Sequence, residues 1–152
     1  MEHIIHLRKG MAIIRLWHYT LLPYLPKSQL LAQKCECDLI WKDLANDKQT
    51  NHILINYMWS YHQADIEFFQ YYSMLADEFE RRGYNFNYSE YITKDYYRIH
   101  LHPFANHHDH QYLVQCFYNL QEKYIRGQKD FDYHTYVELS NFVRKEVNSY
   151  VK

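Results

Sequence analysis

The sequence predicts an all-α fold: a compact single-domain helical bundle with a long irregular connection between its second and third main helices. Two observations carry this prediction. Apolar residues recur at intervals of three and four along several segments, as on the buried face of a helix. No segment shows the alternation of apolar and polar residues that an amphipathic strand requires. The chain of 152 residues suits one domain. We expect residues 15–152 to form it, after an N-terminal extension of residues 1–14.

The first predicted helix begins at Pro26, because proline has a preset φ and no backbone N–H to lose in the first turn. The helix is expected to run to about Leu44, and the polar run from Asn46 to Asn51 then forms a loop. Apolar side chains should hold this helix against the core. They are Leu30, Leu31, Cys35 and Cys37.

The second predicted helix ends at Gly83, since glycine readily takes the left-handed conformation that closes a helix. No period is evident from Tyr84 to His110, and Pro103 interrupts this stretch, so we expect an irregular connection over the surface. The buried stripe of the second helix is predicted to contain Ile66, Phe69, Tyr72, Ala76 and Phe79.

Two further helices are predicted in the last third of the chain. Asp109 is expected to cap the third helix, which ends at Gly127, and the pair Thr135 and Glu138 has the spacing of a capping box at the start of the fourth. The inward residues of the third helix are predicted to be Leu113, Cys116, Phe117, Leu120 and Tyr124, and those of the fourth Tyr136, Leu139, Val143, Val147 and Tyr150.

The composition limits the classes of protein to which the chain can belong. Lys and Arg number 17 against 18 Asp and Glu, so any face that binds nucleic acid must be a local patch, and the first third of the chain is the best candidate. Three cysteines cannot form a closed disulfide framework, which favours a reducing compartment. No apolar run is long enough to span a membrane. We expect a cytoplasmic monomer without membrane contact.

A histidine cluster in the irregular stretch is a candidate metal site. Clustered imidazoles beside a carboxylate can bind zinc, which would suit a metal-dependent hydrolase. Their spacing matches no known ligand pattern, however, so we expect neither a metal nor another cofactor, and we expect the histidines to line a polar surface. The cluster consists of His100, His102, His107, His108, Asp109 and His110.

Glu36 is the most informative acid in the sequence, because it lies within about a turn of the apolar face of the first helix. A solvated carboxylate is the usual outcome for a glutamate. A partly desolvated one would instead have a raised pKa and could donate or accept a proton. Trp17 and Tyr19 follow closely after Arg15 and are the aromatic residues best placed for contact with a base.

Four blocks of the chain resemble the small pyrimidine-dimer DNA glycosylases, a family that includes phage UV-repair enzymes and bacterial relatives. The similarity extends from about Arg15 to Val143. The blocks are the Arg-Leu-Trp-His run at residues 15–18, the Leu-Pro-x-x-Gln-Leu-Leu-x-Gln-x-x-Glu helix at 25–36, the Arg-Arg-Gly-Tyr helix end at 81–84 and the His-rich turn before Tyr112 and Leu113.

The resemblance implies a DNA repair glycosylase with associated abasic-site lyase activity on cyclobutane pyrimidine dimers in double-stranded DNA. An N-terminal α-amine would attack the sugar C1′, and the resulting imine would lead to β-elimination. Such an amine, with a reference pKa near 8, is neutral at pH 7 far more often than a lysine. Glu36 matches the family's catalytic glutamate, and Arg15 matches its arginine beside the amine. We expect Trp17, His18, Gln29, Gln33 and Lys34 to contact DNA.

The sequence departs from the family pattern at two points. Fourteen residues precede Arg15, whereas family members start at or just before the equivalent position. Translation from Met11 followed by removal of the methionine would leave the amine on Ala12, which we therefore expect to be the nucleophile. Alternatively the extension folds back, or the nucleophile is lost and the chain is a non-catalytic helical module that binds nucleic acid or protein. Cys35 also stands where the phage enzymes carry arginine, with Lys34 as a substitute.

Overall fold

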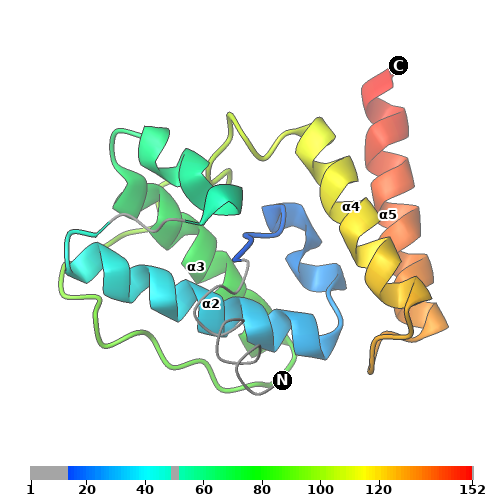
Figure 1. Ribbon diagram of the computed structural model, residues 1–152, viewed down its shortest axis with the longest axis horizontal. Coiled ribbons are helices and arrows are strands. Elements are labelled where there is room, and N and C mark those ends of the chain that lie inside the picture. The colour runs from blue at the N-terminus through cyan, green and yellow to red at the C-terminus, as the bar shows by residue number, and fades with distance from the viewer. Residues whose placement is uncertain (1–13, 49–51, 152) are drawn as a thin grey trace, which may run out of the picture.

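The four predicted helices all form in the computed structural model, which describes residues 14–48 and 52–151 (Figure 1). Two 3₁₀ helices, η1 and η2, were not predicted, because such short segments carry too little periodicity to be distinguished from loops. Within the described residues there is no strand, and the all-α prediction is confirmed. The elements are η1 (Tyr19–Tyr24), α2 (Lys27–Ala45), η2 (Ile53–Ser60), α3 (Ala64–Arg81), α4 (His110–Ile125) and α5 (Tyr133–Val151).

Local signals set most of the helix ends as expected. Pro26 is the N-cap of α2, and Gly83 closes α3 with a φ of +80°. The carboxylate of Asp109 caps α4, accepting a hydrogen bond from the backbone N–H of Tyr112 at 2.8 Å. The capping box predicted for α5 is wrong. The helix begins at Tyr133, because Asp132 accepts from the backbone N–H of Thr135 at 2.8 Å and takes the capping role.

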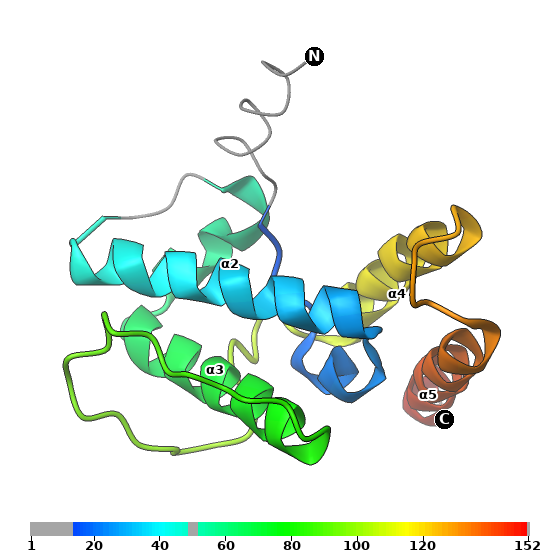
Figure 2. The same ribbon diagram turned by 90° about the horizontal axis from the view of Figure 1, so that it is seen from below.

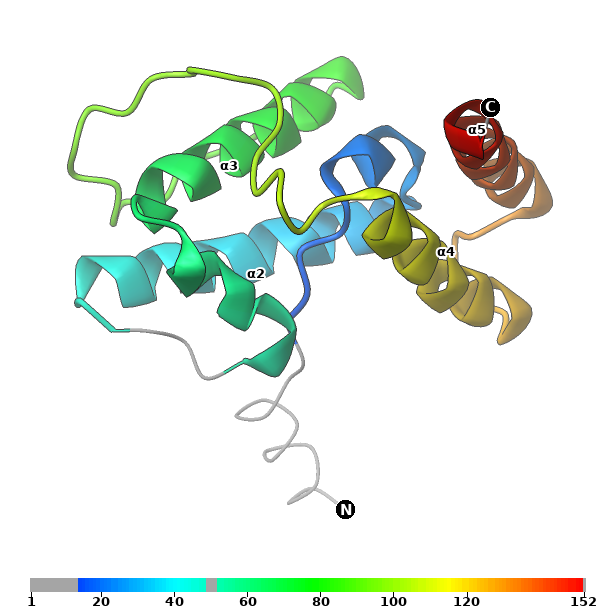
Figure 3. The ribbon, with the colours of Figure 1, turned by 90° about the horizontal axis from the view of Figure 1, so that it is seen from above.

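Helices α2 and α3 lie side by side, and α4 and α5 form a hairpin at the other end of the molecule (Figures 1 and 2). The short helix η1 lies between these two units and packs against both α3 and α5. Helix α4 packs chiefly on α5, and η1 occupies the space between this hairpin and α3 (Figure 3).

The buried faces of α2 and α3 differ in part from the predicted ones. On α2, Leu30 and Cys37 are buried as expected, but Leu31 and Cys35 are exposed. On α3 the predicted Tyr72 and Phe79 are buried, whereas Phe69 is only half-buried. Its ring stacks on Tyr96 of the connection, with centroids 5.3 Å apart. The fully buried side chains that the prediction missed on α3 are Phe68, Tyr71 and Leu75.

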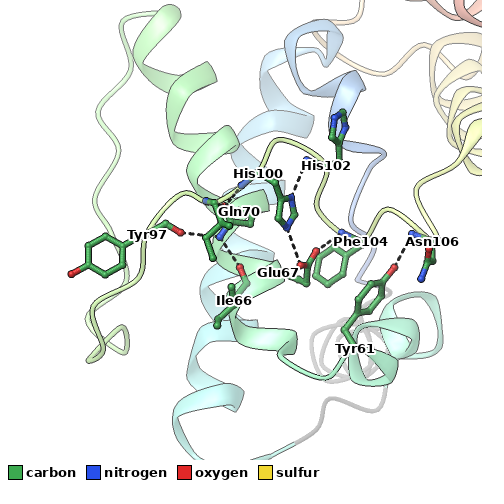
Figure 4. Close-up of polar contacts among 10 residues, drawn as sticks. Tyr61, Ile66, Glu67, Gln70, Tyr97, His100, His102, Phe104 and Asn106 are labelled. Atoms are coloured by element: carbon green, nitrogen blue, oxygen red, sulfur yellow. Dashed lines mark hydrogen bonds and ion pairs between the residues drawn. The ribbon is translucent and has the colours of Figure 1, made fainter.

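The irregular connection between α3 and α4 is held in place by side chains of α3 (Figure 4). The amide of Gln70 donates to the carbonyl of Tyr97 at 3.0 Å and accepts from the N–H of Ile99 at 2.8 Å. The carboxylate of Glu67 accepts from the N–H of Phe104 at 2.9 Å and lies 2.9 Å from Nε2 of His100. These bonds satisfy backbone groups that have no partner in a regular element.

The histidines of the cluster bind separate partners rather than converging on one point. His108 lies 2.7 Å from the hydroxyl of Tyr57, His107 lies 2.9 Å from that of Tyr61, and His102 lies 2.9 Å from that of Tyr19. In the part of the chain that the structure describes, no group of three or more His, Cys, Asp or Glu residues could hold a metal ion.

Among the described residues, none of the helices is both long and apolar enough to cross a bilayer.

Two buried histidines make the stability of the fold sensitive to acid. Burial lowers the pKa of His18 to about 4 and holds the pKa of His108 well below its usual range. As the pH falls, the two histidines therefore take up protons in the unfolded chain, where their pKa values are near 6.5, before they do so in the folded chain. The stabilisation is complete above pH 6.5 and is lost as the pH falls towards 4.

We expect this loss to amount to about 2 kcal/mol for His18 in urea unfolding followed at pH 7 and pH 4. His18→Asn, whose amide does not titrate, should reduce the difference in unfolding free energy between the two pH values. The matched change His134→Asn affects an exposed side chain on α5 and should leave that difference unaltered. Equal pH dependence in the wild type and His18→Asn would contradict the assignment.

Candidate active site

A cavity of about 240 Å³ lies where the segment before η1 meets α2 and α4. The segment supplies an arginine and a tryptophan, and α2 supplies a glutamine and a glutamate. The C-terminal half of α4 supplies three polar residues, and the residue that caps its end supplies an arginine. The cavity is therefore built from parts of the chain separated by about a hundred positions. Its lining consists of Arg15, Trp17, Gln29, Glu36, Asn119, Glu122, Lys123 and Arg126.

Glu36 is the acid of this cavity, and it is half-buried rather than solvated. Burial raises its pKa from about 4.5 to about 7, while a backbone hydrogen bond at Arg15 and the charges of Lys123 and Arg15 act in the opposite direction. Near neutral pH the carboxyl group is therefore present in both protonation states. Such a group can both accept and donate a proton during a reaction.

Gln33 lies behind Glu36 and joins α2 to the segment that carries Arg15. Its amide nitrogen donates to the carbonyl of Arg15 at 2.7 Å and to Oε1 of Glu36 at 3.2 Å. Its amide oxygen accepts from the backbone N–H of Trp17 at 2.8 Å and lies 2.8 Å from the hydroxyl of Tyr71. One side chain thus fixes the relative positions of the arginine and the acid.

Further contacts hold the segment of residues 14–18 rigidly. The hydroxyl of Tyr112 donates to the carbonyl of Leu16 at 2.6 Å, and the hydroxyl of Tyr71 lies 2.7 Å from the carbonyl of Trp17. The guanidinium of Arg15 lies over the ring of Trp17, 5.2 Å from its centroid, a geometry that stabilises a cation.

The structure brings together four of the residues singled out from the sequence, namely Arg15, Trp17, Gln29 and Glu36. Trp17 lines the cavity although only 5% of its surface is exposed to solvent. Gln29 donates to the side chain of Gln128 at 3.0 Å. Ala12, the expected nucleophile, lies outside the described residues.

The other three predicted DNA-binding residues do not line the cavity. Gln33 is 1% exposed and His18 is 5% exposed, and Nδ1 of His18 is engaged by Thr20 at 2.9 Å. Lys34 pairs with Asp38 at 2.6 Å and lies over the ring of Phe86. These arrangements suit support of the site better than direct contact with a ligand.

Sequence reasoning missed the contribution of α4. Asn119, Lys123 and Arg126 are spaced four and three residues apart, so they share one polar face of the helix, and Glu122 binds Arg126 at 3.0 Å. That spacing was a usable signal. It was overlooked because an exposed polar face is the usual surface of an amphipathic helix.

A carboxyl group whose pKa is shifted by burial, and which lies beside cations in a cavity, marks a candidate functional site. The family model for pyrimidine dimer DNA glycosylase matches residues 14–91, and the chain belongs to this family. No curated protein and no solved structure matches the chain. The matched segment contains Arg15 and Glu36, whereas α4 lies beyond it.

The raised pKa of Glu36 has a consequence for stability that can be measured. Between pH 4.5 and 7, Glu36 is protonated in the folded chain but ionised in the unfolded chain. Its contribution to the free energy of unfolding is therefore complete below pH 4.5 and is lost as the pH rises through 7. Glu36→Gln removes the buried charge. We expect the variant to unfold at a temperature about 3 °C above the wild type at pH 8, and at nearly the same temperature at pH 5.

Glu138→Gln is the matched control, because that carboxylate is exposed on α5 and surface substitutions change stability little. Thermal unfolding followed by circular dichroism at both pH values makes the measurement. A Glu36→Gln variant that is less stable than the wild type at pH 8 would show that the ionised carboxylate supports the fold.

Proposed function

We propose that the protein is a DNA repair glycosylase that releases a damaged pyrimidine from dimers in double-stranded DNA and then cleaves the abasic site. The observation that carries this proposal is the half-buried carboxyl group of Glu36 in a cavity beside Arg15 and Lys123. Membership of the pyrimidine dimer DNA glycosylase family supports the choice of substrate.

Release of a base from its sugar is assisted by a carboxylate near the sugar ring. Breaking the bond between a base and its sugar generates positive charge on the sugar ring, which a nearby fixed carboxylate stabilises. A carboxyl group that titrates near pH 7 can also move protons in the later steps. Arg15, held over Trp17, supplies a guanidinium that can bind a phosphate through two parallel hydrogen bonds.

The cavity is small. Its volume of about 240 Å³ is below the range of about 300–1,000 Å³ that encloses drug-sized ligands. Enzymes that act on a base in a duplex turn the nucleotide out of the stack. We therefore place one sugar of the lesion in the cavity, with the flanking phosphates against the cations of Arg15, Lys123 and Arg126.

The buried residues of the site have an indirect part in this proposal. Gln33 positions both Arg15 and Glu36 through its amide, and the ring of His18 packs against the rings of Tyr19 and His108. Gln33 and His18 therefore support the site in this proposal, whereas the sequence suggested that they contact DNA directly. Gln29 and the edge of Trp17 remain candidates for contact with the substrate.

The first test concerns Glu36. We expect Glu36→Gln to lower the rate of strand nicking on UV-irradiated plasmid by about 100-fold or more, because preorganised electrostatic groups commonly contribute that much. DNA affinity should change little, since the variant keeps the shape of the side chain. Glu138→Gln again serves as the control. Nicking by Glu36→Gln at the rate of the wild type would remove the carboxylate from the mechanism.

The second test concerns the nucleophile for base release, for which we propose the α-amine of Ala12. A chain that begins at Ala12 should release the dimerised base faster than the full chain, because its amine is three residues before Arg15 and a nucleophile close to C1′ gains orders of magnitude in effective concentration. The control is the same short chain with its amine acetylated, which should be inactive in base release. Unchanged base release after acetylation would exclude the α-amine.

The main rival function is a helical module that binds nucleic acid or protein without catalysis. It predicts no base release by any form of the chain, with DNA affinity retained if the ligand is nucleic acid. The metal-dependent hydrolase receives no support from the described residues, among which no group of three or more His, Cys, Asp or Glu residues could hold a metal ion.

A further inference from the structure

A second cavity, of about 500 Å³, lies where the C-terminal end of α2 meets η2, the start of α3 and the connection that follows α3. This corner is at the end of α2 and α3 that lies away from α4 and α5 (Figures 1 and 2). It shares no lining residue with the candidate active site. Its volume falls within the range of about 300–1,000 Å³ that is typical of sites for small molecules.

Aromatic rings from four parts of the chain line this second cavity, which we call the aromatic cavity. They come from α2, from η2, from the turn between η2 and α3, and from the connection. The face of such a ring carries partial negative charge and attracts a cation. The tryptophan and tyrosine residues of the lining are Trp41, Trp59, Tyr61, Tyr91 and Tyr96.

Contacts behind the aromatic cavity hold several of these rings in place. Trp41 is buried, with its ring centroid 5.0 Å from that of Phe68 and 5.4 Å from that of Tyr96. The hydroxyl of Tyr61 accepts from the backbone N–H of Asn106 at 3.1 Å (Figure 4). Walls that are already ordered lower the entropic cost of binding a ligand.

Two carboxylates give the aromatic cavity an acidic character. Asp47 is exposed after α2 and forms no ion pair with any residue that the structure describes. Oδ2 of Asp65 accepts from the hydroxyl of Tyr96 at 2.8 Å and lies 3.8 Å from Nζ of Lys94. No described residue binds the other oxygen, Oδ1. Both carboxylates can therefore accept hydrogen bonds from a ligand.

We propose that the aromatic cavity binds a small organic cation, an ammonium group carried on an apolar body. The ring faces would surround the body, and the ammonium group would donate hydrogen bonds to Asp47 and Asp65. The inference goes beyond the proposed function and does not rest on it, because the two cavities are separate.

The lining argues against the other classes of ligand. Lys94 is its one lysine or arginine, so two carboxylates would repel the phosphates of a nucleotide or of DNA. A neutral ligand would displace water from the carboxylates without compensating their charge. A bare metal ion lacks a site, since no group of three or more His, Cys, Asp or Glu residues in the described part of the chain could hold one.

The test compares two probes of the same shape by isothermal titration calorimetry on the full chain. Phenethylamine is a cation at neutral pH, and 2-phenylethanol carries a hydroxyl in place of the ammonium group. We expect phenethylamine to bind at least about 10-fold more tightly, because the alcohol loses the cation–ring contacts and the charge-assisted hydrogen bonds. Equal affinity for the two probes, or no binding of phenethylamine at millimolar concentration, would overturn the proposal.

Variants of the lining test the contribution of each group. Asp47→Asn and Asp65→Asn should each weaken phenethylamine binding about 10-fold, because the amide has no charge. Asn at position 65 can still accept from Tyr96, so the fold should persist, and thermal unfolding checks this. The matched control is Asp43→Asn, which is also on α2 but does not line the cavity. Wild-type affinity in both lining variants would contradict the assignment.

A last measurement places the probe in the aromatic cavity rather than beside Glu36. Trp41 and Trp59 are two of the three tryptophans in the chain, so phenethylamine should change the tryptophan fluorescence, and Trp59→Phe should lose much of that change. Glu36→Gln should leave the affinity for phenethylamine unaltered. An affinity lowered by Glu36→Gln, or a fluorescence change untouched by Trp59→Phe, would put the cation at another site and overturn the inference.

Discussion

The side-chain amide of Gln33 is the contact on which the arrangement of the site depends. Its nitrogen reaches the carbonyl of Arg15 and the carboxyl group of Glu36, and its oxygen reaches the N–H of Trp17 and the hydroxyl of Tyr71. A buried amide is costly unless its donors and acceptors are satisfied, and here the partners come from three segments of the chain. The network therefore forms only when all three are correctly placed, and it couples the fold to the geometry of the acid.

The features that were predictable from sequence are those set by local chemistry. Pro26, Gly83 and Asp109 mark helix ends through backbone constraints or a cap within three residues, and all three appear where expected. Predictions failed where a choice depended on distant parts of the chain. Phe68 is fully buried against Trp41 of α2, whereas the predicted Phe69 is half-buried against Tyr96, which belongs to a stretch with no period.

The same division applies to the site. Arg15 and Glu36 were found because a distinctive block of sequence surrounds each, but Lys123 acquires its place only through the docking of α4 and α5. The loop between these helices is joined to α2 by hydrogen bonds between Asp130 and Ser28, which are 102 positions apart. The family match also ends at residue 91, before α4 begins. One wall of the cavity thus lies within the residues that the family model matches, and the other lies beyond them.

The sparse cations of the cavity determine how such a protein would search a genome. Affinity for undamaged duplex comes mainly from counterions released when basic side chains neutralise phosphates, and here only Arg15, Lys123 and Arg126 lie at the cavity, the last already paired with Glu122. In a chain whose net charge is −1, long-lived sliding along intact DNA would be disfavoured. Selection of a damaged site would then depend on how easily the distorted duplex yields a nucleotide to the cavity, a property of the lesion itself.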